Sequence, residues 1–346
     1  MRLHLHIGTE KTGSTALQSY LAAHREVLAA EGVVMPDFLE SSNHRALASV
    51  FMRDEQDDDY LQAEGISAPA ARAKRRKELI KALKLQLRRA KASHRVMIIS
   101  SEHFHSRLLS QAEVTSFCKA IFPLFKGVKV TCYLRRQDLM ALSFYTQKLR
   151  GGFIPPTILP IRSVRLHRPE LPPFFDYLSL LERWESAAGT EAIEPVVYER
   201  SSLINGDVIQ DFFARIKCKY PGNGRQKTLN SSYSAAGQLA LLTFNRLHAG
   251  NQELRAQSQE VRLRLDQFLQ ESAPGDAVLP SREEADEFMQ AFVDSNRRVA
   301  RKWFEREELF IEPGPSYPEN DTPPDWEKAS LLLAKFAGEV GSLDAC

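Results

Sequence analysis

Near its N-terminus the chain carries a short apolar segment that runs directly into a glycine-bounded loop. Leu3–Ile7 alternates apolar residues with histidines, which is typical of a β-strand, and Gly8 ends it. The apolar spacing over Ser14–Ala30 then predicts an amphipathic helix. Backbone amides converge where a loop enters a helix, so residues 8–15 are predicted to bind an anion such as phosphate.

Short β-rich segments alternate with helical patterns through the first 220 residues. Further strands are predicted at Val33–Met35, Val96–Ile99, Val128–Leu134 and Glu194–Tyr198, with helices at 70–93, 110–122, 137–149 and 174–188. This alternation favours an α/β fold with a central parallel sheet and helices on both faces. Acidic residues 53–66 are expected to form a mobile surface loop.

After residue 220 the pattern becomes helical only. Helices are predicted at Ser234–Leu247, Gln252–Gln270 and Arg282–Phe304, with one more in the last 30 residues. We therefore predict an α/β core over residues 1–220. A C-terminal helical extension over residues 221–346 is expected to pack on that core as one structural unit.

The charge balance excludes a nucleic-acid binder that works through its overall field. The chain has 46 basic and 44 acidic residues, a net charge of +2, so anion binding must depend on local cations. Residues 70–93 form one strongly basic segment. This segment is either a solvated surface helix or a docking face for a polyanionic acceptor, and the sequence leaves both open.

Other general features indicate a cytoplasmic protein. No apolar segment approaches the ~20 residues of a membrane span, and no charged-then-apolar leader is present. Cys118 and Cys132 lie in apolar segments and are expected to be buried free thiols, while Cys218 and Cys346 complete a set without metal-ligand spacing. Contact with a membrane surface and the oligomeric state stay open.

The loop Gly8–Thr15 differs from an ATP-binding loop at one decisive position. In the motif G-x-x-x-x-G-K-[ST], a lysine follows the second glycine, whereas here Ser14 follows Gly13 and the lysine is Lys11, inside the loop. No convincing acidic strand end is found to hold Mg²⁺, which a kinase needs. A sulfuryl group carries less charge than a phosphoryl group, so a lysine and backbone donors suffice for its transfer without a metal.

The loop T-E-K-T-G-S-T resembles the 5′-phosphosulfate loop of PAPS-dependent sulfotransferases, whose core is K-[TS]-G-[ST]-[ST]. The resemblance implies a P-loop-like three-layer fold and PAPS (3′-phosphoadenosine 5′-phosphosulfate) as co-substrate, with no metal. It implies that the donor is bound by Lys11, Thr12, Gly13, Ser14 and Thr15.

A second motif resembles the 3′-phosphate site of the same family. Arg135 ends a predicted strand and Ser143 follows eight positions later, as in that motif. An arginine clamps a phosphate with two parallel hydrogen bonds, and a serine hydroxyl adds another. Arg136-Gln137 replaces the usual Asn-Pro, as in many bacterial members.

A third segment, residues 225–232, is similar to the late loop that closes over the 3′-phosphate in this family. The resemblance would assign Lys227, Asn230 and Ser232 to the donor site, although the R-K-G motif of the cytosolic branch is absent. The alternative is a capped helix start with Ser232 as N-cap. Both interpretations stay open at this stage.

Sulfuryl transfer to a hydroxyl needs a base and a cation near the leaving phosphate. Lys11 is the predicted cation. Glu102 is the first choice for the base, because it follows the predicted strand Val96–Ile99, and His103 and His44 are further candidates. Each of the three has the alternative of being an ordinary loop residue. The histidines of the first strand, His4 and His6, are expected to pack in the core.

The sequence therefore predicts a PAPS-dependent sulfotransferase that resembles bacterial members, and we expect it to belong to the carbohydrate branch. The partner is a hydroxyl-bearing acceptor, such as a glycan or glycolipid precursor. One rival hypothesis is a P-loop kinase that uses ATP on a small molecule. Another is a non-catalytic nucleotide-binding member of the same fold.

Overall fold

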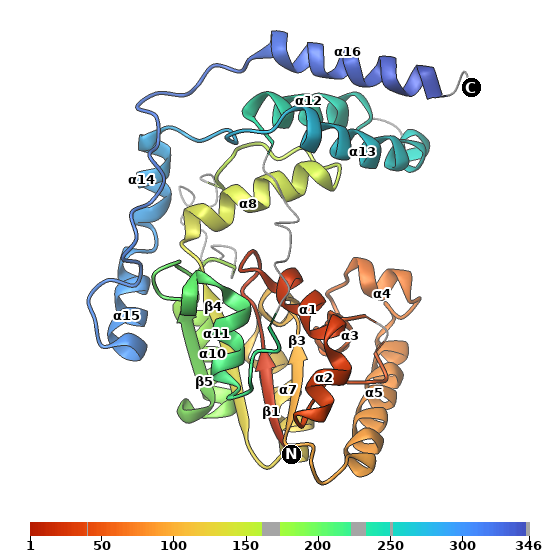
Figure 1. The fold of residues 1–346 in the computed structure, drawn as a ribbon, viewed down its shortest axis with the longest axis vertical. Coiled ribbons are helices and arrows are strands. Elements are labelled where there is room, and N and C mark those ends of the chain that lie inside the picture. The colour runs from red at the N-terminus through yellow and green to blue at the C-terminus, as the bar shows by residue number, and fades with distance from the viewer. Residues whose placement is uncertain (40, 161–173, 223–232, 250–251, 344–346) are drawn as a thin grey trace. The chain divides into compact units, whose positions relative to one another are not determined.

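A computed structural model describes residues 1–39, 41–160, 174–222, 233–249 and 252–343 (Figure 1). The chain divides into two compact units that do not follow the order of the sequence. The first comprises residues 1–136, 169–225 and 292–313, and the second comprises residues 137–168, 226–291 and 314–346. The division predicted at residue 220 is a separate hypothesis about domains, and it stays a prediction.

The first unit is built on a five-stranded, wholly parallel sheet, which confirms the predicted fold class. Its strand order is β2-β3-β1-β4-β5. The strands are β1 (Arg2–His6), β2 (Val33–Val34), β3 (Val96–Ser100), β4 (Val128–Leu134) and β5 (Ile193–Val197). Because β1 lies between β3 and β4, the loop that follows β1 emerges beside the ends of both neighbours.

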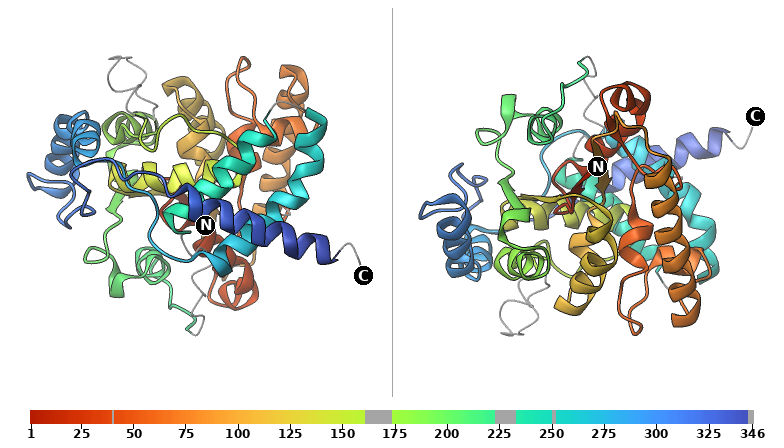
Figure 2. Two further views of the ribbon diagram at one scale, coloured as in Figure 1. Left: turned by 90° about the horizontal axis from the view of Figure 1, so that it is seen from above. Right: turned by 90° about the horizontal axis from the view of Figure 1, so that it is seen from below.

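Helices cover both faces of this sheet, in three layers. In the right-hand view of Figure 2, α1 (Ser14–Ala23), α2 (Arg25–Ala30) and α11 (Val208–Arg215) lie on one side, and α7 (Gln111–Ile121) and α10 (Tyr177–Ala188) on the other. One core cluster joins α1 and α11 to the sheet through Leu17, Ile98, Tyr133 and Phe212, among others. On the opposite side, the Trp184 indole of α10 meets the aromatic rings of Phe104 and Phe117. Burial of apolar surface, to which these rings contribute, is the main stabilising contribution in such a fold.

Two predicted helices are interrupted. The helix predicted over Ser14–Ala30 breaks at His24, whose imidazole stacks on the Tyr20 ring and whose Nδ1 lies 2.9 Å from the Tyr20 carbonyl oxygen. The His24 backbone, with φ −108° and ψ 18°, leaves the helical conformation and ends α1. The helix predicted over Arg282–Phe304 is likewise two helices, α14 (Arg282–Gln290) and α15 (Val293–Phe304), which fall in different units.

The segment expected to be an irregular surface loop, residues 53–66, is partly helical. A short helix, α4 (Asp59–Ala63), forms there, and its N-cap Asp58 accepts a hydrogen bond from the Leu61 amide at 2.9 Å. The Asp58 side chain is only 4% exposed, because two arginines surround it. From the sequence, the three successive aspartates were expected to be solvated. The ion pairs of Asp58 with Arg45 and Arg107 could not be predicted from it.

The second unit is helical. It contains α8 (Gln137–Arg150), α12 (Ala235–Leu247), α13 (Gln252–Ser272), α14 and α16 (Trp326–Leu343). Of these, α8, α12, α13 and α16 share a core cluster that includes Leu241, Leu269 and Phe336. Ser234 caps α12 by accepting from the Gly237 amide, so the alternative of Ser232 as the cap is wrong. None of the described helices is long and apolar enough to cross a membrane.

The predicted core positions of His4 and His6 are confirmed. His6 is 1% exposed, its Nδ1 lies 2.8 Å from the Ser100 hydroxyl, and burial lowers its pKa to about 3. His4 is 5% exposed, and its Nε2 lies 2.7 Å from the Thr131 hydroxyl. Cys118 and Cys132 are buried free thiols, as expected.

The burial of His6 predicts a loss of stability in weak acid. Its imidazole stays neutral in the folded protein down to a pKa of about 3, whereas the unfolded chain binds a proton below about 6.5. The contribution of His6 to the free energy of unfolding should therefore fall by about 1–2 kcal/mol between pH 6.5 and pH 5. Urea unfolding at several pH values should show a shallower decline for His6→Gln than for the wild type. Equal slopes for the two proteins would contradict the assignment.

Candidate functional site

The loop between β1 and α1 is held against β4 by backbone hydrogen bonds. The Thr9 amide donates to the Tyr133 carbonyl at 2.9 Å, and the Tyr133 amide donates to the Gly8 carbonyl at 2.6 Å. The Thr9 hydroxyl donates to the same Tyr133 carbonyl at 2.9 Å. These contacts extend the pairing of β1 with β4 and fix the first half of the loop.

Two glycines allow the shape of this loop. Gly8 has φ +102°, and a Cβ there would lie 3.1 Å from the Glu102 Cα. Gly13 has φ +79° and is the N-cap of α1, where a Cβ would lie 2.9 Å from Val208 Cγ1. Gly8 therefore lets the loop approach the end of β3, and Gly13 leaves the start of α1 without a capping side chain.

Lys11 adopts a left-handed backbone conformation, with φ 64°. Its carbonyl accepts a hydrogen bond from Arg135 Nη1 at 2.8 Å. The Arg135 carbonyl in turn accepts from the Tyr177 hydroxyl. The structure thus brings together Lys11 and Arg135, which the sequence assigned to opposite ends of one nucleotide.

The predicted hydroxyl donors of the loop differ in accessibility. Thr12 is fully buried, and its hydroxyl donates to the Thr9 carbonyl at 2.6 Å, so this side chain supports the loop from within. Ser14 is 5% exposed, with its hydroxyl 3.5 Å from the same carbonyl. Thr15 is exposed. Of the three hydroxyls, that of Thr15 is the one open to a ligand.

Glu102 lies beside the loop, at the N-terminal end of α6 (His103–Arg107). Its Oε2 accepts from Gln18 Nε2 at 2.8 Å, and its Oε1 accepts from Asn43 Nδ2 at 3.0 Å. Gln18 is 4% exposed and also donates to the Ser100 hydroxyl at 3.3 Å. Two amide side chains from different segments therefore fix the direction of one carboxylate at the end of β3.

A second carboxyl group, that of Glu10, lies in the loop near Glu102. Burial raises the pKa of Glu10, the Ser106 hydroxyl opposes that shift, and the negative charge of Glu102 adds to it. The Glu10 amide donates to His105 Nδ1 at 3.4 Å, and His105 Nε2 lies 3.0 Å from the Phe174 carbonyl oxygen. His105 is thus a buried support for the loop, and burial lowers its pKa to about 3.

The other two candidate bases are less suited to accept a proton. His44 is 1% exposed, and its Nδ1 accepts from the Ser100 amide at 2.9 Å, which places the imidazole proton on Nε2. Burial lowers the pKa of His44 to about 3. Burial also lowers the pKa of His103 to about 3, and the charges of Arg45 and Arg107 add to this effect. A base with so low a pKa is weak at neutral pH.

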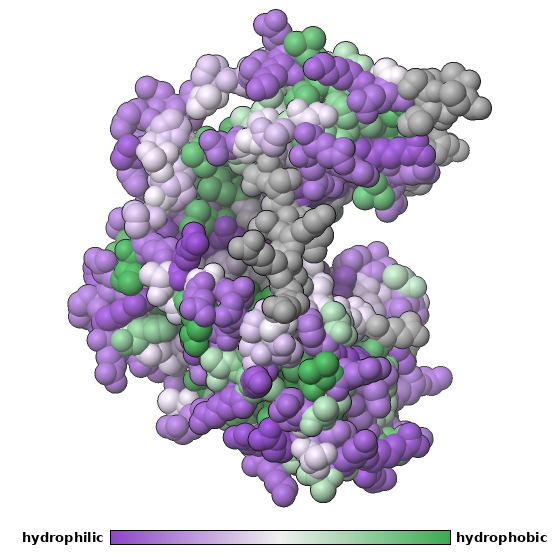
Figure 3. Space-filling model, in the orientation of Figure 1, coloured by the Kyte–Doolittle hydropathy of each residue, from purple (hydrophilic) through white to green (hydrophobic). Residues whose placement is uncertain are grey.

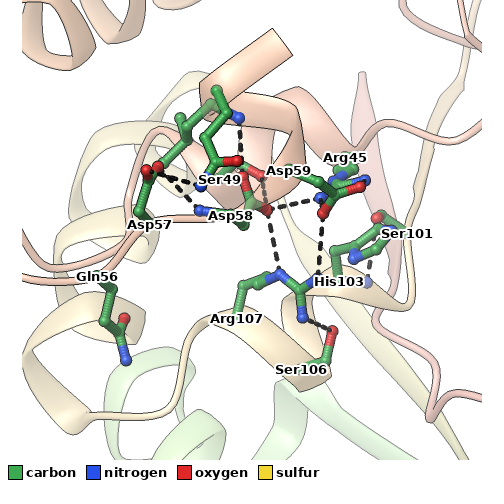
Figure 4. Close-up of polar contacts among 12 residues, drawn as sticks. Arg45, Ser49, Gln56, Asp57, Asp58, Asp59, Ser101, His103, Ser106 and Arg107 are labelled. Carbon is green, nitrogen blue, oxygen red and sulfur yellow. Dashed lines mark hydrogen bonds and ion pairs between the residues drawn. The ribbon is translucent and has the colours of Figure 1, made fainter. Parts of the chain in front are cut away.

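Next to Glu102, a charge cluster joins the segment of residues 41–66 to α6 (Figure 4). The Asp58 carboxylate contacts Arg45 at 2.9 Å and Arg107 at 3.1 Å, and these arginines lower its pKa to about 2 against the opposing effect of burial. Asp59 also pairs with Arg45. A pocket of about 400 Å³ adjoins this cluster, lined by Met52, Gln56, Asp57, Asp58, Asp59, Ser106, Arg107 and Leu109.

The remaining predicted donor residues are not part of this geometry. Ser143 lies on α8 in the second unit and Arg135 lies in the first, so the pairing of the two stays a prediction. Lys227, Asn230 and Ser232 lie outside the described residues. Within the described parts of the chain, no group of three or more His, Cys, Asp or Glu side chains is arranged to hold a metal ion.

Sequence reasoning missed Gln18, Asn43 and Glu10. Gln18 lies one turn after Ser14, on the buried side of α1. Its position in the sequence does not indicate that its side chain binds another polar group. Asn43 precedes His44, which drew attention instead. Glu10 was visible within the loop motif, yet only its burial near Glu102 separates it from an ordinary surface glutamate.

Comparisons with known proteins give limited similarity. No family model matches the chain. An uncharacterized protein of Archaeoglobus fulgidus is 28% identical over 218 residues, which are 62% of this chain and 55% of that protein, so the match spans about half of the relative. The crystal structure of a sulfotransferase from Alicyclobacillus acidocaldarius is 12% identical, with a TM-score of 0.44, and the alignment covers 87% of this chain and 94% of that one. At this low TM-score the function has to be argued from the residues of the site.

Replacement of Gly13 should cost more than its backbone conformation alone predicts. Gly13→Ala places a Cβ against Val208 Cγ1 and forces a left-handed alanine, which by itself costs roughly 1–2 kcal/mol. Gly65→Ala is a matched control, because Gly65 has φ +66° and no atom within 4 Å of the new Cβ. Urea unfolding should show the larger loss for Gly13→Ala. Equal losses would mean that the loop tolerates displacement from Val208.

Proposed function

We propose that this chain is a PAPS-dependent sulfotransferase that transfers a sulfuryl group to an acceptor hydroxyl and releases adenosine 3′,5′-bisphosphate. One observation carries the proposal. A loop with its lysine at Lys11, and Ser14 in the position of the kinase lysine, lies directly against a strand-end carboxylate, Glu102. This arrangement supplies a cation for the leaving phosphate and a base for the acceptor without calling on a metal.

The loop would bind the 5′ end of the donor. The amides at the start of α1 and the exposed Thr15 hydroxyl would hold the 5′-phosphate, with Lys11 near the oxygen that bridges phosphorus and sulfur. Arg135, at the end of the adjacent strand β4, is proposed for the 3′-phosphate. Ser143, Lys227, Asn230 and Ser232 complete the proposed donor site.

Glu102 is the proposed base. Its carboxylate accepts the proton of the acceptor hydroxyl while the acceptor oxygen forms a bond to sulfur. The bond between sulfur and the bridging oxygen breaks, its electron pair stays on the phosphate oxygen, and Lys11 stabilises that charge. His44, with its Nδ1 occupied by the Ser100 amide, is better placed to support the end of β3 than to touch a substrate.

The acceptor is proposed to be a carbohydrate or glycolipid. Incubation with sulfur-labelled PAPS and a panel of glycan, glycolipid and phenol acceptors, with and without chelator, tests the assignment. Labelled product that survives chelation supports it. Stabilisation of the fold by Mg²⁺ and ATP but not by adenosine 3′,5′-bisphosphate would instead indicate a kinase, and tight binding of the bisphosphate without turnover would indicate a non-catalytic protein.

Lys11→Ala should lower kcat by about 10²–10³-fold, the usual effect of removing one donor to a developing negative charge. The affinity for adenosine 3′,5′-bisphosphate should change much less, because the loop amides and Arg135 remain. Steady-state kinetics and calorimetric binding measure the two quantities. Lys119→Ala, on the exposed side of α7, serves as control. An equal loss in kcat and in product affinity would argue against a role in the transition state.

Glu102→Gln should lower kcat by about 10²–10⁴-fold, as expected when a general base is removed. The substitution keeps the size of the side chain and one amide oxygen for Gln18 or Asn43, so donor binding should be retained. Gln18→Leu and Asn43→Leu, which leave the carboxylate but remove its supports, should lower kcat by smaller factors. Retention of full activity in Glu102→Gln would exclude Glu102 as the base.

A further inference from the structure

The basic helix α5 (Pro69–Arg89) has two chemically different faces. Leu79 and Leu83 are buried, at 2% and 0% exposed, and attach the helix to the first unit. The opposite face carries a set of exposed cations, which we call the α5 cationic row: Lys74, Lys77, Lys81, Lys84 and Arg88. In Figure 3 the surface at the lower right, where Figure 1 places α5, is mostly hydrophilic.

The spacing of the α5 cationic row is regular. Its members are separated by three or four residues, so at 100° per residue they fall within an arc of about 80°. At 1.5 Å per residue the row is about 21 Å long, with one cation roughly every 5 Å. Glu78, the acidic residue of α5, lies 3.6 Å from Arg75, which offsets its charge. Among the described residues, no member of the row makes a side-chain hydrogen bond or an ion pair.

The N-terminal half of α5 is fixed to the segment that borders the proposed base. Arg72 is fully buried and donates to the carbonyls of Arg53 at 2.6 Å, Gln56 at 2.8 Å and Ser67 at 2.9 Å. Arg76 donates to the Val50 carbonyl at 2.8 Å. The same segment carries Asn43, which holds Glu102. One segment of the chain therefore contacts both the N-terminal half of α5 and the proposed base.

We propose that the α5 cationic row binds the acceptor, and that this acceptor is a linear acidic polysaccharide. A single row of cations matches a polymer with charges repeated along one line better than it matches the plane of a membrane. The proposed transfer needs an acceptor hydroxyl, which every unit of a polysaccharide carries and the interior of a DNA strand lacks. The inference rests on the proposed function, whose acceptor class it narrows.

Polygalacturonate, a uniform hydroxyl-bearing polyanion, is the probe. Its binding to the full chain, without PAPS, is measured by fluorescence anisotropy over a range of salt concentrations. The triple variant Lys77→Glu/Lys81→Glu/Lys84→Glu should bind at least tenfold more weakly. The slope of log Kd against the logarithm of the salt concentration should be smaller by about 2–3. Lys119→Glu/Lys126→Glu/Lys219→Glu makes the same change in net charge at exposed positions elsewhere on the first unit and should bind nearly as the wild type.

Further measurements separate this inference from the proposed function. Both triple variants should unfold at urea concentrations close to that of the wild type and should keep sulfuryl transfer to a small hydroxyl acceptor. Equal weakening in the two triple variants would overturn the inference, because it would show a general effect of net charge. Equal or tighter binding of a DNA oligonucleotide, of anionic phosphatidylserine vesicles or of neutral dextran would also overturn it. Polygalacturonate binding through the row, with no transfer from PAPS to any acceptor, would refute the proposed function and leave the row as a polyanion site.

Discussion

The two hydrogen bonds that hold Glu102 connect the parts on which the site depends. Gln18 comes from the helix that follows the loop, Asn43 from the segment after α2, and Glu102 from the end of β3. Parallel strands place their carboxyl ends at one edge of the sheet, so three segments that are distant in sequence meet there. The low exposure of Gln18 means that water cannot replace the bond that it makes.

The sheet was predictable because its strands are short apolar runs separated by helical patterns. The Leu3–Ile7 and Val128–Leu134 predictions match β1 and β4 within a residue, since buried parallel strands leave a strong signal in sequence. The break at His24 and the burial of Asp58 were not predictable, because both depend on partners that only the folded chain supplies. For the site, the two motifs predict Lys11 and Arg135 and the end of a predicted strand gives Glu102, and their roles stay predictions, whereas the supports Gln18 and Asn43 emerge only from geometry. The donor residues Ser143, Lys227, Asn230 and Ser232 stay predictions.

The overall charge of this protein differs from its local charges, and the local charges determine which partners it can bind. A net charge of +2 hides a helix with a long line of exposed cations and, close by, three successive aspartates. Arg45 and Arg107 offset much of the aspartate charge and lock the segment of residues 41–66 to α6. The first unit thus presents a basic surface on α5 and an acidic one at Asp57 and Asp59, which a net charge near zero does not reveal.

The bond from Arg135 to the Lys11 carbonyl links the two ends of the proposed donor site through the protein itself. If Arg135 binds a 3′-phosphate as proposed, its guanidinium would give up part of its bond to the Lys11 carbonyl, and binding at the two ends of the donor would be coupled. An Arg135 substitution would then remove this support of the loop together with the proposed phosphate contact. The two effects are separable only by a double-mutant cycle that pairs Arg135 with a change in the loop.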